Sequence, residues 1–467
     1  MKGLLHERLG RVAALRPASS SGARETRSTE GLPAAAEELA RMVAATPARN
    51  SHGEYLSVRR WFDGHECTAS LDSAVRRMTA DAPREAVDPA QWLFLDTETT
   101  GLAGGSGTYA FLVGLAWWDA GGLEVEQLFL RDYSEEHAVL EALAGRMAER
   151  RVLVTFNGRS FDWPLLETRY RMTRRISAAA PAAHLDLLHP ARQLWRLKFG
   201  SVRLMDLEQN VLTPLGGVDW HREGDIPGAL IPQAYFAYLR GGGPEALSQV
   251  FRHNQMDLRG LAALATRLMA MLTDPEAATS DPLELYGLSR LVARRGQPVH
   301  ARRLYECALA AGLPEEADRA ARRELARLAK RERDFDRATE LWEDILGETR
   351  DGLDAYEQLA IYYEHRARAP ERALELTHEA LAALRAAWQR GSIPPGAYRR
   401  LRERLTKRMQ RLENGRTPRG PGDGLFAPEN SPAASNRNPV SRPLRAQARE
   451  RDRTQSSDRR LSGPGRT

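Results

Sequence analysis

The stretch Leu93–Leu102, LFLDTETTGL, combines the apolar pattern of a buried strand with two carboxylates. Residues two apart on a strand face the same side, so Asp96 and Glu98 are expected to point together. Two like charges in a core strand repel each other and lose hydration unless a positive group joins them. Mg²⁺ or Mn²⁺ would meet this need, because both prefer oxygen ligands. The alternative is a strand end at which both acids reach water.

Two later segments carry further candidate residues. TFNGRSFDWPLL reads as a strand that ends at Asn157, followed by Asp162 at the start of a helix. HNQMD lies on a long helix expected at 244–272, where His253 and Asp257 are four residues apart and share one face. Each segment alone is weak evidence for a functional site, since an Asp at a helix start is often a cap and a lone His is often a core residue.

The order of elements around these motifs predicts an α/β fold. Short turns between successive strands favour antiparallel pairing, and the helices that follow place a mixed sheet between helical layers. The expected elements are strands at 92–98, 111–118 and 123–130, a helix at 134–150, a strand at 151–158 and a helix after it.

The second half of the chain predicts helices only, with an internal repeat. ARRLYECAL (301–309), ATELWEDIL (338–346) and ALELTHEAL (373–381) align without gaps, each with Ala first, Leu three residues later and Leu last. This period of 35 to 37 residues resembles tetratricopeptide (TPR) repeats, in which stacked helix pairs share a core. An ordinary helical bundle is the alternative.

Composition narrows the cellular context. The net charge of +6 is accounted for by the segment 411–467, which holds twelve Arg against six acidic residues, so the rest is close to neutral. The two cysteines, Cys67 and Cys307, are far apart, which argues against a disulfide scaffold and favours a reducing cytoplasm. No apolar run is long enough to cross a membrane, so no membrane association is expected.

These observations divide the chain into five parts. We expect a flexible N-terminal segment at 1–50, with a short helix at 36–45, an uncertain lead-in at 51–90, an α/β domain at 91–275, helical repeats at 282–412 and a disordered Arg-rich tail at 413–467.

Together, DTETTGL, FNGRSFDWPLL and HNQMD resemble the three motifs of the DEDD exonuclease superfamily, which has the ribonuclease-H-like fold. The closer resemblance is to the YprB-like family of predicted bacterial ribonuclease-H-like exonucleases, which includes the TGLAGGSGTYAFLVG turn, the HLDLLHPARQLW segment and the DIPG run. The resemblance covers roughly residues 90–272, and the helical repeats behind them also look like that family.

The resemblance implies a ribonuclease-H-like mixed sheet flanked by helices, followed by an all-α TPR-like domain, and it implies roles for individual residues. Two Mg²⁺ or Mn²⁺ ions would be bound by Asp96, Glu98, Asp162 and Asp257. His253 would orient or deprotonate the attacking water, although its spacing of four from Asp257 departs from the usual His at five.

Four polar residues are expected near the substrate: Thr97, Thr99, Asn157 and Asn254, the two asparagines alternatively holding the carboxylates. The segment HLDLLH contains three further residues of types that bind metals: His184, Asp186 and His189. A mononuclear site there is one interpretation, and a structural or peripheral role for Asp186 is the favoured one.

The predicted activity is a 3′–5′ exonuclease that hydrolyses single-stranded or frayed nucleic-acid ends by a two-metal mechanism, with DNA or RNA as substrate. A structure-specific endonuclease on the same fold is one alternative. A non-catalytic adaptor that grips nucleic acid and recruits a protein is another. In either case the repeats would offer a concave surface to a protein partner, and the basic tail would tether nucleic acid.

Overall fold

The computed structural model describes residues 31–63, 71–78, 83–101, 107–177, 180–348 and 352–415. Its centre is a seven-stranded mixed sheet with the order β1-β2-β5-β4-β3-β6-β7. The strands are β1 (Thr46–Asn50), β2 (Gly53–Asp63), β3 (Trp92–Thr99), β4 (Ala110–Asp119), β5 (Gly122–Phe129), β6 (Val152–Thr155) and β7 (Ala183–Asp186).

Strand β3 marks the change of direction in the sheet. It pairs antiparallel with β4 and parallel with β6, which in turn pairs parallel with β7. The β4–β5 hairpin closes through two residues with positive φ, Ala120 at 49° and Gly121 at 82°, the backbone of a tight turn that matches strand twist. This arrangement confirms the predicted mixed sheet.

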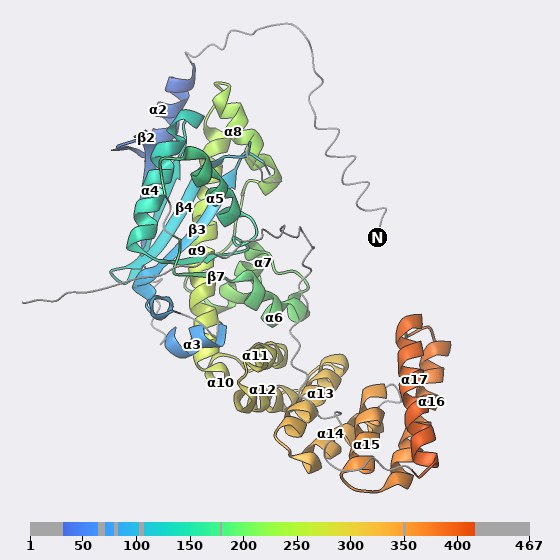
Figure 1. The fold of residues 1–467 in the computed structure, drawn as a ribbon. Coiled ribbons are helices and arrows are strands. Elements are labelled where there is room, and N and C mark those ends of the chain that lie inside the picture. Colours follow the sequence, from blue (N-terminus) through green and yellow to red (C-terminus); the bar gives the residue numbers. More distant parts are fainter. Residues whose placement is uncertain are drawn as a thin grey trace, which may run out of the picture.

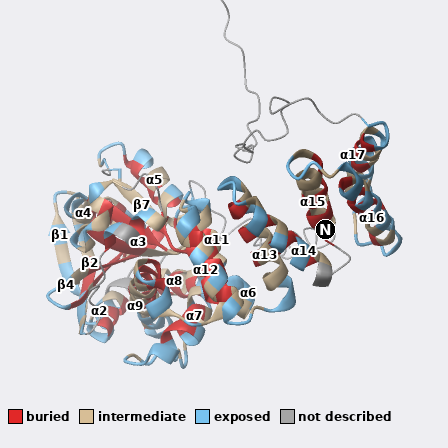
Figure 2. Cartoon of the chain, turned by 90° about the horizontal axis from the view of Figure 1, so that it is seen from below, coloured by how far each residue is buried: buried red, intermediate tan, exposed pale blue. Residues whose placement is uncertain are grey.

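Helices cover both faces of the sheet (Figure 1). They are α2 (Gly31–Val43), α3 (Leu71–Met78), α4 (Glu136–Glu149), α5 (Asp162–Thr173), α6 (Leu188–Phe199), α7 (Leu204–Leu207), α8 (Ile231–Leu239), α9 (Glu245–Thr273) and α10 (Pro275–Ala278). Alternation along β3 divides its side chains. Trp92 and Phe94 pack with α3, α6 and the second half of α9, whereas Leu93 and Leu95 pack with α4 and α5. The central strands are accordingly buried (Figure 2).

The N-terminal prediction was wrong in part. Residues 1–30 lie outside the described part of the chain, but 31–50, expected to be mostly flexible, contain α2 and β1, and the expected helix at 36–45 is found at Gly31–Val43. Strand β1, TPARN, has no apolar alternation. It is a strand because its backbone pairs with β2, which the local sequence does not reveal.

The second half of the chain is helical, as predicted, and consists of α11 (Pro282–Arg294), α12 (Pro298–Ala310), α13 (Glu315–Arg331), α14 (Phe335–Glu348), α15 (Leu353–His365), α16 (Pro370–Gln389) and α17 (Pro395–Glu413). These helices follow one another away from the sheet (Figure 1). The predicted disordered tail lies almost wholly in 416–467, outside the described residues. None of the helices that the structure describes has the length and apolarity needed to cross a membrane.

The aligned repeat positions are structurally equivalent. Ala301, Ala338 and Ala373 lie in the first turns of α12, α14 and α16, each the second helix of a pair, and all three are buried. The Leu residues three positions later are buried as well. The sequence repeat therefore reflects repeated packing of helix pairs.

The first helix of this part is packed closely against the α/β domain. At Gly287 on α11, an added Cβ would lie 2.7 Å from the carbonyl oxygen of Gln193 and 2.8 Å from the Cα of Leu194, so α11 crosses α6 at close range. The buried carboxylate of Glu284 accepts hydrogen bonds from the Trp195 indole at 3.2 Å and from Lys198 at 2.8 Å. The two parts thus share a packed junction.

Candidate active site

Strand β3 presents Asp96 and Glu98 toward α9. Both residues have the same parity as Trp92 and Phe94, which face the core under α9. They lie in the second half of the strand, where burial changes from complete to partial. The two acids therefore lie on one face of β3, at the margin of the core.

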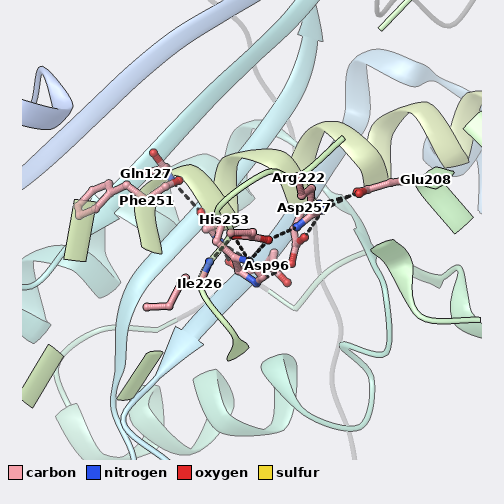
Figure 3. A network of polar contacts seen from close by, with 10 residues as sticks. Asp96, Gln127, Glu208, Arg222, Ile226, Phe251, His253 and Asp257 are labelled. Atoms are coloured by element: carbon pink, nitrogen blue, oxygen red, sulfur yellow. Dashed lines mark hydrogen bonds and ion pairs between the residues drawn. The ribbon is translucent and has the colours of Figure 1, made fainter. Parts of the chain in front are cut away.

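Asp96 is held by an amide that reaches down from α9. Asn254 Nδ2 donates to Asp96 Oδ2 at 2.8 Å, and Gln127 Nε2 donates to Asn254 Oδ1 at 2.9 Å (Figure 3). Asp96 and Gln127 flank Gly114 in register across three adjacent strands. An added Cβ on Gly114 would lie 2.2 Å from Asn254 Oδ1, so only glycine leaves room for this contact.

Asp162, the first residue of α5, approaches from the other side of β3. The hydroxyl of Thr97, which points away from Asp96 and Glu98, donates to Asp162 Oδ1. The loop before α5 is anchored by Asp186 on β7, whose carboxylate accepts hydrogen bonds from the backbone N–H groups of Asn157, Arg159 and Leu188. This fixes where α5 begins, and with it the position of Asp162.

His253 and Asp257 lie one helical turn apart on α9. His253 Nδ1 is 2.8 Å from an oxygen of Asp225, and its Nε2 is 3.5 Å from Asp257 Oδ2. Burial lowers the pKa of His253, but the carboxylates of Asp257, Glu98 and Asp225 raise it more, so the net shift is upward. Asp225 thus orients the ring and leaves Nε2 directed toward the acids.

Arg222 is a buried cation at the edge of this cluster. Its guanidinium forms two hydrogen bonds with Glu208, at 2.6 and 2.7 Å, and an ion pair with Asp257 at 2.5 Å (Figure 3). Glu208 lies on a short π-helical turn, Glu208–Leu212, directly against Gly260 of α9, where a Cβ would lie 1.9 Å from its Oε1. Burial raises the pKa of Glu208 to about 7, although Arg222 acts in the opposite direction.

The charges of the other three predicted acids act on the pKa of Asp96. Burial and the charges of Asp257, Glu98 and Asp162 hold the pKa of Asp96 well above its ordinary value. Burial raises the pKa of Glu98 to about 8; His253 lowers it, and Asp257 and Asp162 raise it further. Burial also raises the pKa of Asp162. These carboxylates repel one another in a poorly hydrated place, which favours a cation among them.

The donor chemistry fits a hard divalent ion, because the four acids offer only carboxylate oxygens. The geometry of the four side chains, however, is not that of a formed metal site. Within the described residues, no three His, Cys, Asp or Glu side chains are gathered as a group that could hold a metal ion. One reason is visible at Asp257, whose carboxylate is directed to Arg222. Asp96, Glu98, Asp162 and Asp257 are the residues that would hold the ion, with Asp257 shared between it and Arg222.

The expected substrate-binding residues have different surroundings. Asn254 is fully buried and both ends of its amide are bonded, which favours the alternative in which it holds a carboxylate over substrate binding. The hydroxyl of Thr97 is likewise bonded to Asp162. Thr99 donates to the carbonyl of Gly101, and Asn157 lies in the loop before α5 with φ of 72°.

The HLDLLH segment forms part of the scaffold. Asp186 binds backbone N–H groups, and His184 Nε2 is 2.8 Å from the Thr155 hydroxyl. Burial, helped by Arg159, lowers the pKa of His184 to about 4. The mononuclear metal interpretation finds no support among the described residues, whereas the hydrogen bonds of Asp186 to backbone N–H groups are those of a structural residue.

Sequence reasoning missed the residues that position the acids: Gln127, Glu208, Arg222 and Asp225. Asp225 begins the DIPG run that contributed to the family resemblance, so a signal for it existed. No sequence signal marked Arg222 and Glu208. They are fourteen positions apart in segments without regular periodicity, and tertiary packing alone pairs them.

Comparisons with known proteins agree with this architecture. Residues 93–269 match the family model of the RNase_H superfamily. The chain is 31% identical over 292 residues to a protein of Bacillus subtilis (strain 168) described as uncharacterized protein YprB, and the match covers 62% of this chain and 68% of that protein. The chain therefore belongs to the YprB-like family, and its α/β part is a ribonuclease-H-like domain, a fold that suggests nuclease activity.

Proposed function

We propose that this protein is a metal-dependent nuclease, and specifically a 3′–5′ exonuclease that acts on single-stranded or frayed nucleic-acid ends by a two-metal mechanism. One observation carries the proposal: Asp96 and Glu98 of β3 lie where burial, and then the charges of Asp162 of α5 and Asp257 of α9, raise their pKa values. Four partly buried carboxylates from three elements repel one another, and a divalent-metal site accounts for their convergence.

The chemistry assigned to the chain is mainly positioning. Bound divalent ions would activate a water and neutralise the departing oxygen of a phosphodiester. His253 directs Nε2 toward the acids and is fixed at Nδ1 by Asp225, which suits it to orient or deprotonate that water. Asn254 and Thr97 hold Asp96 and Asp162 in place from outside the cluster.

Contacts with the substrate are assigned to the rim. Thr99 follows Glu98 at the end of β3, and Asn157 lies in the loop before α5. We keep both as substrate-binding candidates, Thr99 through its backbone. The substrate class, DNA or RNA, and the 3′–5′ direction remain part of the proposal.

The test is degradation of 5′-labelled single-stranded oligonucleotides, DNA and RNA, with Mg²⁺ or Mn²⁺. The wild type should shorten the oligonucleotide stepwise from its 3′ end, and Asp162→Asn should be inactive. A circular single strand distinguishes an exonuclease from the endonuclease alternative. An endonuclease would cleave the circle, whereas an exonuclease cannot start on it. Equal cleavage by wild type and Asp162→Asn would end the proposal.

A second candidate, a non-catalytic adaptor, is favoured by one observation. Asp257 is neutralised by Arg222, and no group able to hold a metal ion stands ready among the described residues. In that case the acids would be structural, and the TPR-like helix pairs would recruit a protein partner while the ribonuclease-H-like domain binds nucleic acid. Nucleic-acid binding with neither cleavage nor divalent-metal binding would decide for the adaptor.

A further inference from the structure

A cavity lies where the helical part meets the ribonuclease-H-like domain. It has a volume of about 400 Å³ and lies between β7, α6 and the end of α11, with Met78 of α3 at its margin. Its floor comes from the domain, through Arg159, His184 and Gln193, and its far wall comes from Arg294 and Arg295. Neither part of the chain forms it alone.

Three guanidinium groups line this cavity. Arg294 and Arg295 are exposed, and within the described residues no ion pair or side-chain hydrogen bond is found for either. Arg159 donates to the carbonyl of His184, which holds it at the wall. The lining acid is Asp186, and its oxygens already accept three backbone N–H groups. Three guanidinium groups face one carboxylate, so the lining carries an excess of positive charge, and the oxygens of Asp186 are already engaged by the backbone.

The charge is local. The chain outside 411–467 is close to neutral, so three arginines gathered on one cavity do not follow from a generally basic domain. Gln193 also lines the cavity, and its buried Oε1 has no hydrogen-bond partner among the described residues. A side-chain amide left without a partner can present its oxygen or its NH₂ group to a polar ligand.

The cavity is also close to the acids along the chain. Arg159 lies three residues before Asp162, in the loop that Asp186 anchors. The opposite wall is rigid, because Glu284 and the close approach at Gly287 fix α11 on α6. The loop that carries Arg159 into the cavity therefore also leads to Asp162 at the start of α5.

A neighbouring cavity of about 590 Å³ between α6, α11 and α13 serves as a comparison. It shares Arg294, but it also contains Glu316 and Glu324, together with Tyr286 and Tyr305, which are buried. Its mixed charges give no preference for an anion. The uncompensated positive charge belongs to the 400 Å³ cavity.

We propose that Arg159, Arg294 and Arg295 bind a backbone phosphate of the nucleic-acid strand at the junction of the two parts. This rests on the proposed function for the identity of the strand. Arginine guanidinium groups bind phosphate oxygens in a bidentate geometry, and contacts of this kind position a strand without reading its sequence. The helical part thereby contributes directly to the substrate path.

The experiment measures binding of a fluorescein-labelled single-stranded oligonucleotide to the full chain by anisotropy, in a chelator so that no metal-dependent cleavage alters the probe. Arg294→Ala/Arg295→Ala should bind about tenfold more weakly. Its plot of log K against log salt should be shallower by at most about 0.7, the contribution of one neutralised phosphate on a single strand. Arg294→Ala alone should show about half of the change in slope.

The control is Arg385→Ala/Arg399→Ala, which removes the same charge from exposed positions on α16 and α17, at the far end of the helical part (Figure 1). It should leave affinity and slope unchanged. An equal loss of oligonucleotide affinity in both double variants would contradict the proposed phosphate site. Unchanged binding by Arg294→Ala/Arg295→Ala with a normal thermal melt would contradict it as well. Inorganic phosphate that raises the melting temperature of the wild type, with oligonucleotide affinity untouched by the substitutions, would indicate free phosphate instead and overturn it too.

Failure of this inference is separable from failure of the nuclease proposal. If the wild type cleaves with Mn²⁺ but the arginine substitutions do not alter binding, only the phosphate site is lost. If the wild type does not cleave but the arginine substitutions weaken binding and flatten the salt slope, the phosphate site stands and the nuclease proposal fails.

Discussion

Asn254 Nδ2 lies 2.8 Å from Asp96 Oδ2 and ties the long helix α9 to the central strand β3. Gln127 fixes the orientation of the amide by donating to Asn254 Oδ1, so the Asn254 NH₂ group is directed at the acid. Asp96 is thereby held through Oδ2 by a buried and fully bonded amide. The buried hydrogen bond between Asn254 and Asp96 thus helps to set the geometry of the candidate active site.

Gly114→Ala should disrupt this contact, because the new Cβ would lie 2.2 Å from Asn254 Oδ1. We expect a loss of about 1–3 kcal/mol in the free energy of unfolding, measured by urea denaturation. Nuclease activity should fall as well, since Asp96 loses its hydrogen-bond donor. The matched control is Gly145→Ala on α4, with nothing within 4 Å of the added Cβ; it should stabilise the protein by about 0.5–1 kcal/mol. A Gly114→Ala protein as stable and active as the wild type would contradict the role of the contact.

Arg222→Met should destabilise the protein strongly, because it leaves the buried Glu208 without its cation. Removing one partner of a buried ion pair costs about 3–5 kcal/mol. Adding Glu208→Gln should restore part of the loss, since the remaining group is then neutral. Arg404→Ala, which breaks an exposed ion pair with Glu357, is the control and should cost less than about 1 kcal/mol. No recovery in the double variant would show that Arg222 acts through contacts other than Glu208.

Asp225→Asn tests the orientation of His253. The amide keeps the shape of the side chain but removes the charge that faces His253 Nδ1 at 2.8 Å. Loss of a carboxylate that orients a functional histidine typically costs about 10–100-fold in activity. The expected signature is a lower kcat with little change in KM, together with an altered pH profile. A change in KM alone would place Asp225 in substrate binding instead.

Glu98 predicts how stability depends on pH when metal is chelated. Its pKa is raised from 4.5 to about 8, chiefly by burial, so the folded protein binds this proton more tightly than the unfolded chain does. The contribution is fully present below about pH 4.5 and is lost as pH rises through about 8, so stability should fall over that interval. Glu98→Gln cannot lose a proton and should show a smaller fall in melting temperature. The exposed Glu371→Gln should behave like the wild type, and identical curves for all three would contradict the shift.

Much of the site was predictable because its signals are local. The alternation in β3 placed Asp96 and Glu98 on one face, and the spacing of four placed His253 with Asp257 on α9. Their meeting was inferred from the family resemblance, since no local pattern specifies which strand a distant helix crosses. The structure adds the means of that crossing, Gly114 under Asn254, which a single sequence shows only as a glycine in a strand.

The rest depends on tertiary packing. Arg222 and Asp225 come from an irregular segment before α8, and their partners are set by how that segment folds over α9. Strand β1 was missed because an edge strand with a polar sequence is specified by pairing with its neighbour. The helix pairs were predictable, since an Ala and Leu repeat recurs at positions that are buried in each pair.

The central claim is that Asp96, Glu98, Asp162 and Asp257 form a divalent-metal site. The most direct measurement is isothermal titration of the chelator-treated full-length protein with Mn²⁺, compared with Asp96→Asn and with the exposed control Glu371→Gln. We predict binding to the wild type and to Glu371→Gln, and its loss or severe weakening in Asp96→Asn. Absence of Mn²⁺ binding in the wild type, or equal binding in Asp96→Asn, would contradict the claim.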